Sequence, residues 1–243
     1  MPARLDGKGS NVRAVSVAGL NLGVFHIESR YPLLHGHLQN AASLGLPVCY
    51  ECVRGITPRQ IVACDPRVER PLIAAAQRLQ ERGVGAMIGA CGSFVNFQSV
   101  LTRVLDVPVF SSVMTAAPLL LRSLPRKRKL LVVFASAASF TSRVVREAAI
   151  EDPSRLVVVG CQDLPAFEPI LENRTSLDAD ALEQQLVRRI RDALAATPAI
   201  GQILFQCSEF APYSGTVQQV FGLPVFDVTS LAQWVARAMQ GRV

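Results

Sequence analysis

The chain has 243 residues, of which half are hydrophobic and 18% are charged, a composition that excludes a disordered chain and predicts a globular protein with a large core. No apolar run approaches the roughly 18 residues of a membrane-spanning helix, and the N-terminus lacks the apolar centre of a signal peptide, so we expect a cytoplasmic protein with no membrane segment. The net charge of +6 comes mainly from scattered arginines, and the one dense basic run, Arg126–Lys129, follows Pro125 in a predicted loop. We therefore predict no nucleic-acid partner.

Short apolar runs alternate with helical patterns along the whole chain, which predicts an α/β fold with mainly parallel sheets flanked by helices. After a flexible tail over residues 1–12, strands are predicted at 20–27, 46–53, 84–90, 107–110, 129–135, 156–160, 202–206 and 224–228. A helix over Pro66–Arg82 starts after Asp65 with a proline in its first turn. A second helix, Asp178–Ala196, carries an apolar stripe at Leu182, Leu186, Ile190 and Leu194.

An internal repeat divides the chain into two halves. Residues 85–94 (GAMIGACGSF) align without a gap with residues 201–210 (GQILFQCSEF), and the same offset of 116 pairs Pro-Val-Phe at 108–110 with Pro-Val-Phe at 224–226. Two related units in tandem explain this pattern. We predict two pseudo-symmetric α/β domains, residues 13–112 together with 224–243 and residues 113–223, with an active-site cleft between them.

Two of the six cysteines, Cys91 and Cys207, occupy matching positions of the repeat, each directly after a predicted strand. Ligands of parallel sheets bind at the carboxyl ends of strands, and a thiol beside a helix N-terminus has a lowered pKa that favours the reactive thiolate. A single buried cysteine is usually a packing residue, but a matched pair is harder to explain that way. The spacing predicts two thiols that face one cleft and exchange a proton with opposite faces of a substrate carbon.

The sequence gives little support to a cofactor. Pyridoxal phosphate needs a lysine, and the three lysines lie in the tail or in the basic run, while no glycine-rich phosphate-binding pattern is present. Cys49 and Cys52 stand three apart in a predicted strand and so point to opposite faces, and Cys64 and Cys161 are interpreted as packing residues. A metal site at His26, His35 and His37 is less favoured than a surface or rim position. We predict no cofactor and no metal.

The motifs ACGS at 90–93 and QCSE at 206–209 resemble the two cysteine motifs of the aspartate/glutamate/hydantoin racemase superfamily, commonly Cys-Asn-Thr and Gly-Cys-Thr-Glu. The similarity extends to His26–Pro32 and to Pro212-Tyr213, which resemble a racemase-like branch whose relatives include arylmalonate decarboxylase and maleate cis-trans isomerase. The loop Pro32–Asn40 departs from that branch, because it lacks the usual acidic residue and keeps only Asn40.

The resemblance implies a cofactor-independent enzyme, commonly a homodimer, that acts on a small carboxylate with Cys91 and Cys207 as catalytic residues. It further implies that residues close to the two cysteines bind the substrate. These implied substrate-binding residues are Gly92, Ser93, Ser208, Glu209, Ser139, Thr141, Arg30 and Asn40.

From these observations we expect an isomerase, a racemase or epimerase that moves the α-proton of a small carboxylate by a two-base cysteine mechanism. Two alternatives stay open from the sequence. One is a cysteine-dependent decarboxylase or cis-trans isomerase of a dicarboxylate, and the other is a catalytically inactive carboxylate-binding protein.

Overall fold

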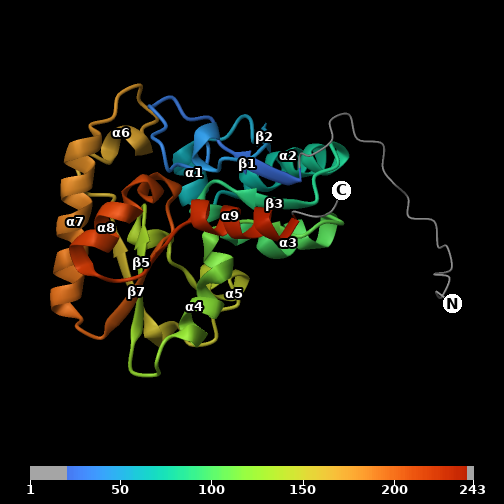
Figure 1. Ribbon diagram of the computed structural model, residues 1–243. Coiled ribbons are helices and arrows are strands. Elements are labelled where there is room, and N and C mark those ends of the chain that lie inside the picture. Colours follow the sequence, from blue (N-terminus) through green and yellow to red (C-terminus); the bar gives the residue numbers. More distant parts are fainter. Residues whose placement is uncertain (1–20, 240–243) are drawn as a thin grey trace, which may run out of the picture.

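The computed structural model describes residues 21–239 (Figure 1), so the tail predicted for residues 1–12 lies outside the described residues. Two four-stranded sheets, all of whose strand pairs are parallel, form the centres of two halves. The first sheet has the order β2-β1-β3-β4 and the second has the order β6-β5-β7-β8. Their strands are β1 (Leu22–His26), β2 (Val48–Cys52), β3 (Ala86–Gly89), β4 (Val109–Phe110), β5 (Lys129–Phe134), β6 (Leu156–Gly160), β7 (Ile200–Phe205) and β8 (Val225–Phe226).

This architecture confirms the predicted fold class, and each of the eight predicted apolar runs contains or overlaps one of these strands. The corresponding strands of the two halves are joined in the same order, so that the predicted repeat is a repeat of topology as well as of sequence.

Helices cover both faces of each sheet (Figure 1). In the first half they are α1 (Pro58–Val62), α2 (Glu69–Glu81) and α3 (Gln98–Val104), followed by α4 (Ala117–Ser123) in the connection to the second half. In the second half they are α5 (Ser142–Glu147), α6 (Glu168–Leu171), α7 (Ala179–Ala196) and α8 (Ser214–Phe221), followed by α9 (Val228–Met239). Short 3-10 turns stand at Ala41–Ser43, Pro66–Val68, Gly92–Phe97, Val113–Ala116, Ala137–Ser139, Pro153–Arg155 and Ser208–Tyr213.

Aspartate side chains cap the starts of the two longest helices, α7 and α2 with its preceding 3-10 turn. Asp178 accepts a hydrogen bond from the Ala181 backbone N–H at the start of α7, and the predicted stripe at Leu182, Leu186 and Ile190 is fully buried against the second sheet. The helix predicted from Pro66 begins as a 3-10 turn, which Asp65 caps at the Arg67 N–H, and continues as α2.

Alternation along the central strands divides the apolar core into three layers. On β5, Leu130, Val132 and Phe134 face a cluster between the halves, whereas Leu131 and Val133 face the helices on the outer side. The shared inner cluster also receives side chains from β1, α4 and α9, so one continuous core joins the two sheets.

The C-terminal segment links the two halves. Strand β8 pairs with β7 in the second sheet, and α9 then crosses to pack against β1 and β3 of the first sheet (Figure 1). No helix of the part of the chain that the structure describes is long and apolar enough to cross a membrane.

Candidate active site

Cys91 and Cys207 stand at equivalent places in the two sheets. Each follows its sheet's third strand in chain order, β3 or β7, in an extended backbone conformation, and each is the N-cap of a 3-10 turn that leads into a helix. The backbone carbonyl of each cysteine accepts a hydrogen bond from the phenylalanine three residues later, at 3.1 Å from Phe94 and 3.2 Å from Phe210. The sequence repeat is therefore also a repeat of local geometry.

The two cysteine segments touch each other through a pair of matched contacts. Ser208 donates its hydroxyl to the Ala90 carbonyl at 2.8 Å, and Gly92 lies so close to Gln206 that an added Cβ would come within 2.0 Å of the Gln206 carbonyl oxygen. The offset of 116 that separates the cysteines converts the Ala90–Ser208 pair into the Gln206–Gly92 pair with the halves exchanged. A local two-fold axis therefore relates the segments, and the two cysteines lie on opposite sides of it.

Both cysteines line one cavity, which we call the cysteine chamber. Its walls are Ile27, Tyr31, Pro58, Val62, Ala90, Cys91, Gly92 and Ser93 from the first half, and Ala135, Phe167, Ile170, Leu171, Gln206, Cys207, Ser208 and Glu209 from the second. The volume of about 40 Å³ is enough for a few water molecules, since one water needs roughly 10–15 Å³ on the same scale. A substrate of several heavy atoms thus requires the walls to move apart.

The chamber disfavours thiolates. Burial raises the pKa of Cys91 to about 12 and raises the pKa of Cys207 well above its ordinary value, and the charge of Glu209 adds to both shifts. The backbone N–H groups of Ser93 and Phe94 oppose the rise in the pKa of Cys91, whereas at Cys207 a single backbone N–H, that of Glu209, opposes it. Cys91 is therefore the better placed of the two to become a thiolate.

Glu209 is an almost fully buried acid at the chamber wall, with 11% of its side chain exposed. Its Oε1 accepts a hydrogen bond from the Tyr31 hydroxyl at 2.8 Å, and His37 Nε2 lies 3.1 Å from the same oxygen. His37 Nδ1 accepts the backbone N–H of Gln39 at 3.0 Å, so the contact with Glu209 is made by the other ring nitrogen, Nε2, without the geometry of a hydrogen bond. These contacts hold the carboxylate of the second half with groups from the first.

The loop that departs from the family pattern supplies His37. At Gly36 the backbone φ is +98°, and an added Cβ would come within 2.8 Å of Pro212 Cα, so only glycine fits between the loop and the second half. Thr229 also donates its hydroxyl to the Gly36 carbonyl at 2.7 Å. The loop is thereby fixed beside Glu209, and His37 is buried with 1% of its side chain exposed, in contrast to the rim position expected for it.

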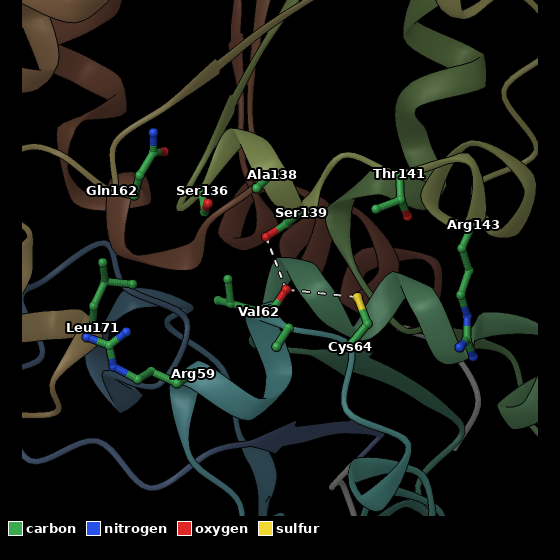
Figure 2. Close-up of a pocket in the computed structure, with 11 residues that line it drawn as sticks. Arg59, Val62, Cys64, Ser136, Ala138, Ser139, Thr141, Arg143, Gln162 and Leu171 are labelled. Atoms are coloured by element: carbon green, nitrogen blue, oxygen red, sulfur yellow. Dashed lines mark hydrogen bonds between the residues drawn. The ribbon is translucent and has the colours of Figure 1, made fainter.

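A second cavity of about 460 Å³ adjoins the chamber and shares Val62 and Leu171 with it; we call it the outer cavity (Figure 2). Figure 2 shows Ser139 bonded to the main-chain oxygen of Val62, at 3.2 Å, with Cys64 on the other side of that oxygen. Arg59 on α1 forms an ion pair with Glu172, the residue after α6, which links the halves beside this cavity. The outer cavity therefore meets the cysteine chamber at Val62 and Leu171, the two residues that line both.

The structure divides the predicted site residues among three places. The cysteine chamber contains Cys91, Cys207, Gly92, Ser93, Ser208 and Glu209. Ser139 and Thr141 line the outer cavity, where Thr141 also caps α5 at the Val144 N–H. Arg30 and Asn40 line neither cavity: the Arg30 backbone N–H donates to Asn173, and the Asn40 side chain donates to the Leu33 carbonyl. The substrate-binding roles of these residues stay predictions.

Tyr31, His37 and Gln206 are site residues that the sequence analysis missed. The sequence contained a signal for Gln206, because the family motif commonly has glycine before the second cysteine and this chain has glutamine there. The remaining cysteines do not reach the chamber, and all six thiols are free. No group of three or more histidine, cysteine or acidic residues within 21–239 could hold a metal ion. The structure describes a single chain, so the homodimer and the cytoplasmic location also stay predictions.

Known proteins with similar sequences are lyases. The chain is 30% identical over 230 residues to dimethylsulfoniopropionate lyase 7 of Emiliania huxleyi, a match that covers 90% of the chain and 67% of that protein. It is 29% identical over 238 residues to a dimethylsulfoniopropionate lyase of Durusdinium sp. clade D, with 95% of the chain and 77% of that protein covered. In two further Emiliania huxleyi lyases, numbered 3 and 6, the chain spans 56% of the relative's length. No protein-family model matches the chain.

Solved structures with the same fold are racemases and a decarboxylase. Glutamate racemase from Thermus thermophilus superposes with a TM-score of 0.59 at 23% identity, covering 92% of this chain and 82% of that one. Allantoin racemase from Klebsiella pneumoniae gives 0.61 at 15% identity, covering 90% and 87%. Unliganded arylmalonate decarboxylase gives 0.54 at 17% identity, covering 91% and 94%. At these identities the similarity establishes the fold, and the fold expected from the resemblance to the racemase superfamily is confirmed.

The predicted isomerase activity is wrong. The similar curated proteins are dimethylsulfoniopropionate lyases, at about 30% identity over most of the chain, and a lyase catalyses an elimination rather than a racemisation or epimerisation. The alternatives left open from the sequence, a decarboxylase, a cis-trans isomerase or an inactive binding protein, do not describe these relatives either. The two matched cysteines predicted the fold correctly, but they did not distinguish an elimination from an inversion, and their catalytic role stays a prediction.

Proposed function

Because the chain belongs to the dimethylsulfoniopropionate lyases within the racemase superfamily, we propose that it eliminates dimethyl sulfide from dimethylsulfoniopropionate or a closely related sulfonium acid. The Cys91 thiolate takes a proton from the carbon next to the carboxylate. The electron pair of that C–H bond forms the new C=C bond, and the adjacent C–S bond breaks with its pair going to sulfur. The products are acrylate, neutral dimethyl sulfide and a protonated Cys91.

The observation that carries the proposal is the Glu209 carboxylate in a chamber without a basic side chain among its lining residues. An ordinary anionic acid would bring like charge towards Glu209 in surroundings of low dielectric constant, where repulsion is strong. A sulfonium acid brings a cation as well as a carboxylate, and the cation offsets the charge of Glu209. Apolar walls at Ile27, Phe167 and Ile170 suit the two methyl groups on that sulfur.

The same cation makes the thiolate easier to form. Glu209 raises the pKa of both thiols, so a bound sulfonium that neutralises Glu209 lowers those pKa values and raises the thiolate fraction. The backbone N–H groups of Ser93 and Phe94 then favour Cys91 as the thiolate. Cys207, with one such donor, stays protonated at the opposite wall.

Elimination needs one base and a separate place for the leaving group. The two sides of the chamber carry different side chains, and this difference fits the two roles. Across the repeat, Ser93 corresponds to Glu209 and Ala90 corresponds to Gln206. The longer polar side chains both come from the second half, which creates a charged end for the sulfonium near Cys207. This places the base and the cation-binding group on opposite sides of the local axis.

The test is incubation of the purified protein with dimethylsulfoniopropionate, with dimethyl sulfide measured by gas chromatography and acrylate by liquid chromatography. We expect equal amounts of both products, abolished activity in C91S and reduced activity in C207S. C64S is the matched control, because Cys64 is partly exposed in the outer cavity and lies outside the chamber. A folded wild-type protein that releases neither product would refute the proposal, and a larger loss in C207S than in C91S would reassign the base.

A further inference from the structure

Gln206 carries a polar group for which the described residues offer no partner. The residue is 2% exposed, it lines the cysteine chamber, and its side-chain Nε2 is buried without a hydrogen-bond acceptor. A buried donor left unpaired destabilises the folded protein, and most such groups in folded proteins are paired. An unpaired amide at the wall of a cavity therefore indicates a ligand that accepts its hydrogen bond.

The Gln206 amide has room beside Gly92 because glycine has no side chain. A Cβ at position 92 would come within 2.4 Å of both Cδ and Nε2 of Gln206. The amide therefore occupies the space that a side chain after Cys91 would fill, on the first half's side of the local axis.

Two other side-chain donors at the chamber are already engaged. Ser208 donates its hydroxyl to Ala90, and the Tyr31 hydroxyl donates to Glu209. No lysine, arginine or histidine is among the lining residues. A carboxylate entering the chamber consequently finds the Gln206 amide as an uncommitted side-chain donor.

We propose that the Gln206 amide binds the carboxylate of the substrate and, if the lyase function holds, stabilises the negative charge that moves onto it during elimination. When Cys91 removes the proton, electron density shifts from the α-carbon into the carboxylate before the C–S bond has fully broken. A donor fixed at those oxygens binds the transition state more strongly than the ground state. Gln206 then binds the carboxylate end of the zwitterionic substrate, and Glu209 binds its sulfonium end.

The binding part of the proposal is tested without any turnover. Propionate has the carboxylate but no leaving group, and its binding is measured as protection of Cys91 and Cys207 from iodoacetamide, at constant ionic strength with chloride as the reference anion. Q206M keeps the length of the side chain without the donor, and Q206E keeps its shape with a negative charge. Q202M is the matched control, because Gln202 lies on β7 outside the chamber and donates to Ser123. Near-ultraviolet circular dichroism verifies that each variant is folded.

We expect propionate to protect the wild type and Q202M equally, and Q206M and Q206E to bind it at least about 10-fold more weakly, as the loss of a hydrogen bond to a charged group predicts. In the lyase assay, kcat of Q206M should fall as well as kcat/KM. Equal propionate protection in the wild type and in both folded Gln206 variants would overturn the assignment, as would a wild type that propionate does not protect. If Gln206 variants lose propionate binding while the wild type shows no lyase activity, the carboxylate site stands and the proposed function fails.

Discussion

The pH dependence of the reaction tests whether a buried thiol is the base. With the pKa of Cys91 raised to about 12 by burial, only about one molecule in 10⁴ carries the thiolate at pH 8, and each further pH unit raises that fraction tenfold. Because kcat/KM reports the free enzyme, it should rise with unit slope, about 100-fold from pH 7 to pH 9. The carboxylate and sulfonium of the substrate do not titrate in this range, so the slope of kcat/KM against pH reports a titrating group of the protein.

Stability sets the upper end of the usable range. Cys91 has a folded-state pKa above its ordinary value of 9.0, so the folded protein holds a proton that the unfolded chain loses. The stability linked to that proton is complete below pH 9 and is lost as the pH rises from 9 towards 12. Rates should therefore be compared between pH 7 and pH 9, with urea denaturation measured at each pH.

The assay is the initial rate of acrylate formation at substrate concentrations well below KM, corrected for elimination by hydroxide without enzyme. At saturating substrate the kcat profile should level off at a lower pH than the kcat/KM profile, because the bound sulfonium offsets the charge of Glu209. A kcat/KM profile that is flat between pH 7 and pH 9, in protein that stays folded, would show that no high-pKa thiol limits the reaction.

Four further substitutions have separate expected outcomes. E209Q should speed alkylation of the chamber thiols at pH 8 by iodoacetamide, because the charge that raises their pKa is gone, and should also raise KM; unchanged alkylation would contradict the role given to Glu209. S208A should lower the free energy of unfolding in urea by about 1 kcal/mol through loss of the hydrogen bond to the Ala90 carbonyl, and an unchanged midpoint would count against that contact. C161A should lose about 1–2 kcal/mol of unfolding free energy from a fully buried site and keep its kcat, since Cys161 lies outside the chamber. R59A breaks the exposed ion pair with Glu172 and should speed access of iodoacetamide to the chamber without shifting the thermal midpoint; a slower reaction would exclude this route of entry.

The fold could be predicted from the sequence because it depends on local patterns. Alternation such as that of Leu130–Phe134, and the stripe at Leu182, Leu186 and Ile190, report which side chains are buried whatever the partner surface is. The repeat around Cys91 and Cys207 predicted in addition that the two halves have the same topology. These signals need no knowledge of distances, and the structure agrees with them.

Most of the site's polar contacts could not be predicted in this way. The contacts of Glu209 with Tyr31 and His37 join residues of different halves, and His37 reaches Glu209 because Gly36 fits against Pro212. A sequence pattern does not show that Gly36 packs against Pro212. Ser139 and Thr141, predicted from the family motif, lie in the neighbouring outer cavity because Val62 and Leu171 stand between it and the cysteines.

The prediction of a racemase failed because it weighed the symmetry of the cysteines and overlooked the asymmetry beside them. A two-base inversion works equally on mirror-image substrates, so it favours similar surroundings for both thiols, whereas here Ala90 is matched with Gln206, at a position where the racemase motif commonly has glycine. One half thus supplies the better thiolate and the other supplies a carboxylate and an amide. A chamber with a base at one side and an acid at the other suits a substrate whose ends differ in charge and whose reaction runs in one direction, as an elimination does. In a duplicated fold of this kind, the positions where the repeat breaks are therefore more informative about the reaction than the positions where it holds.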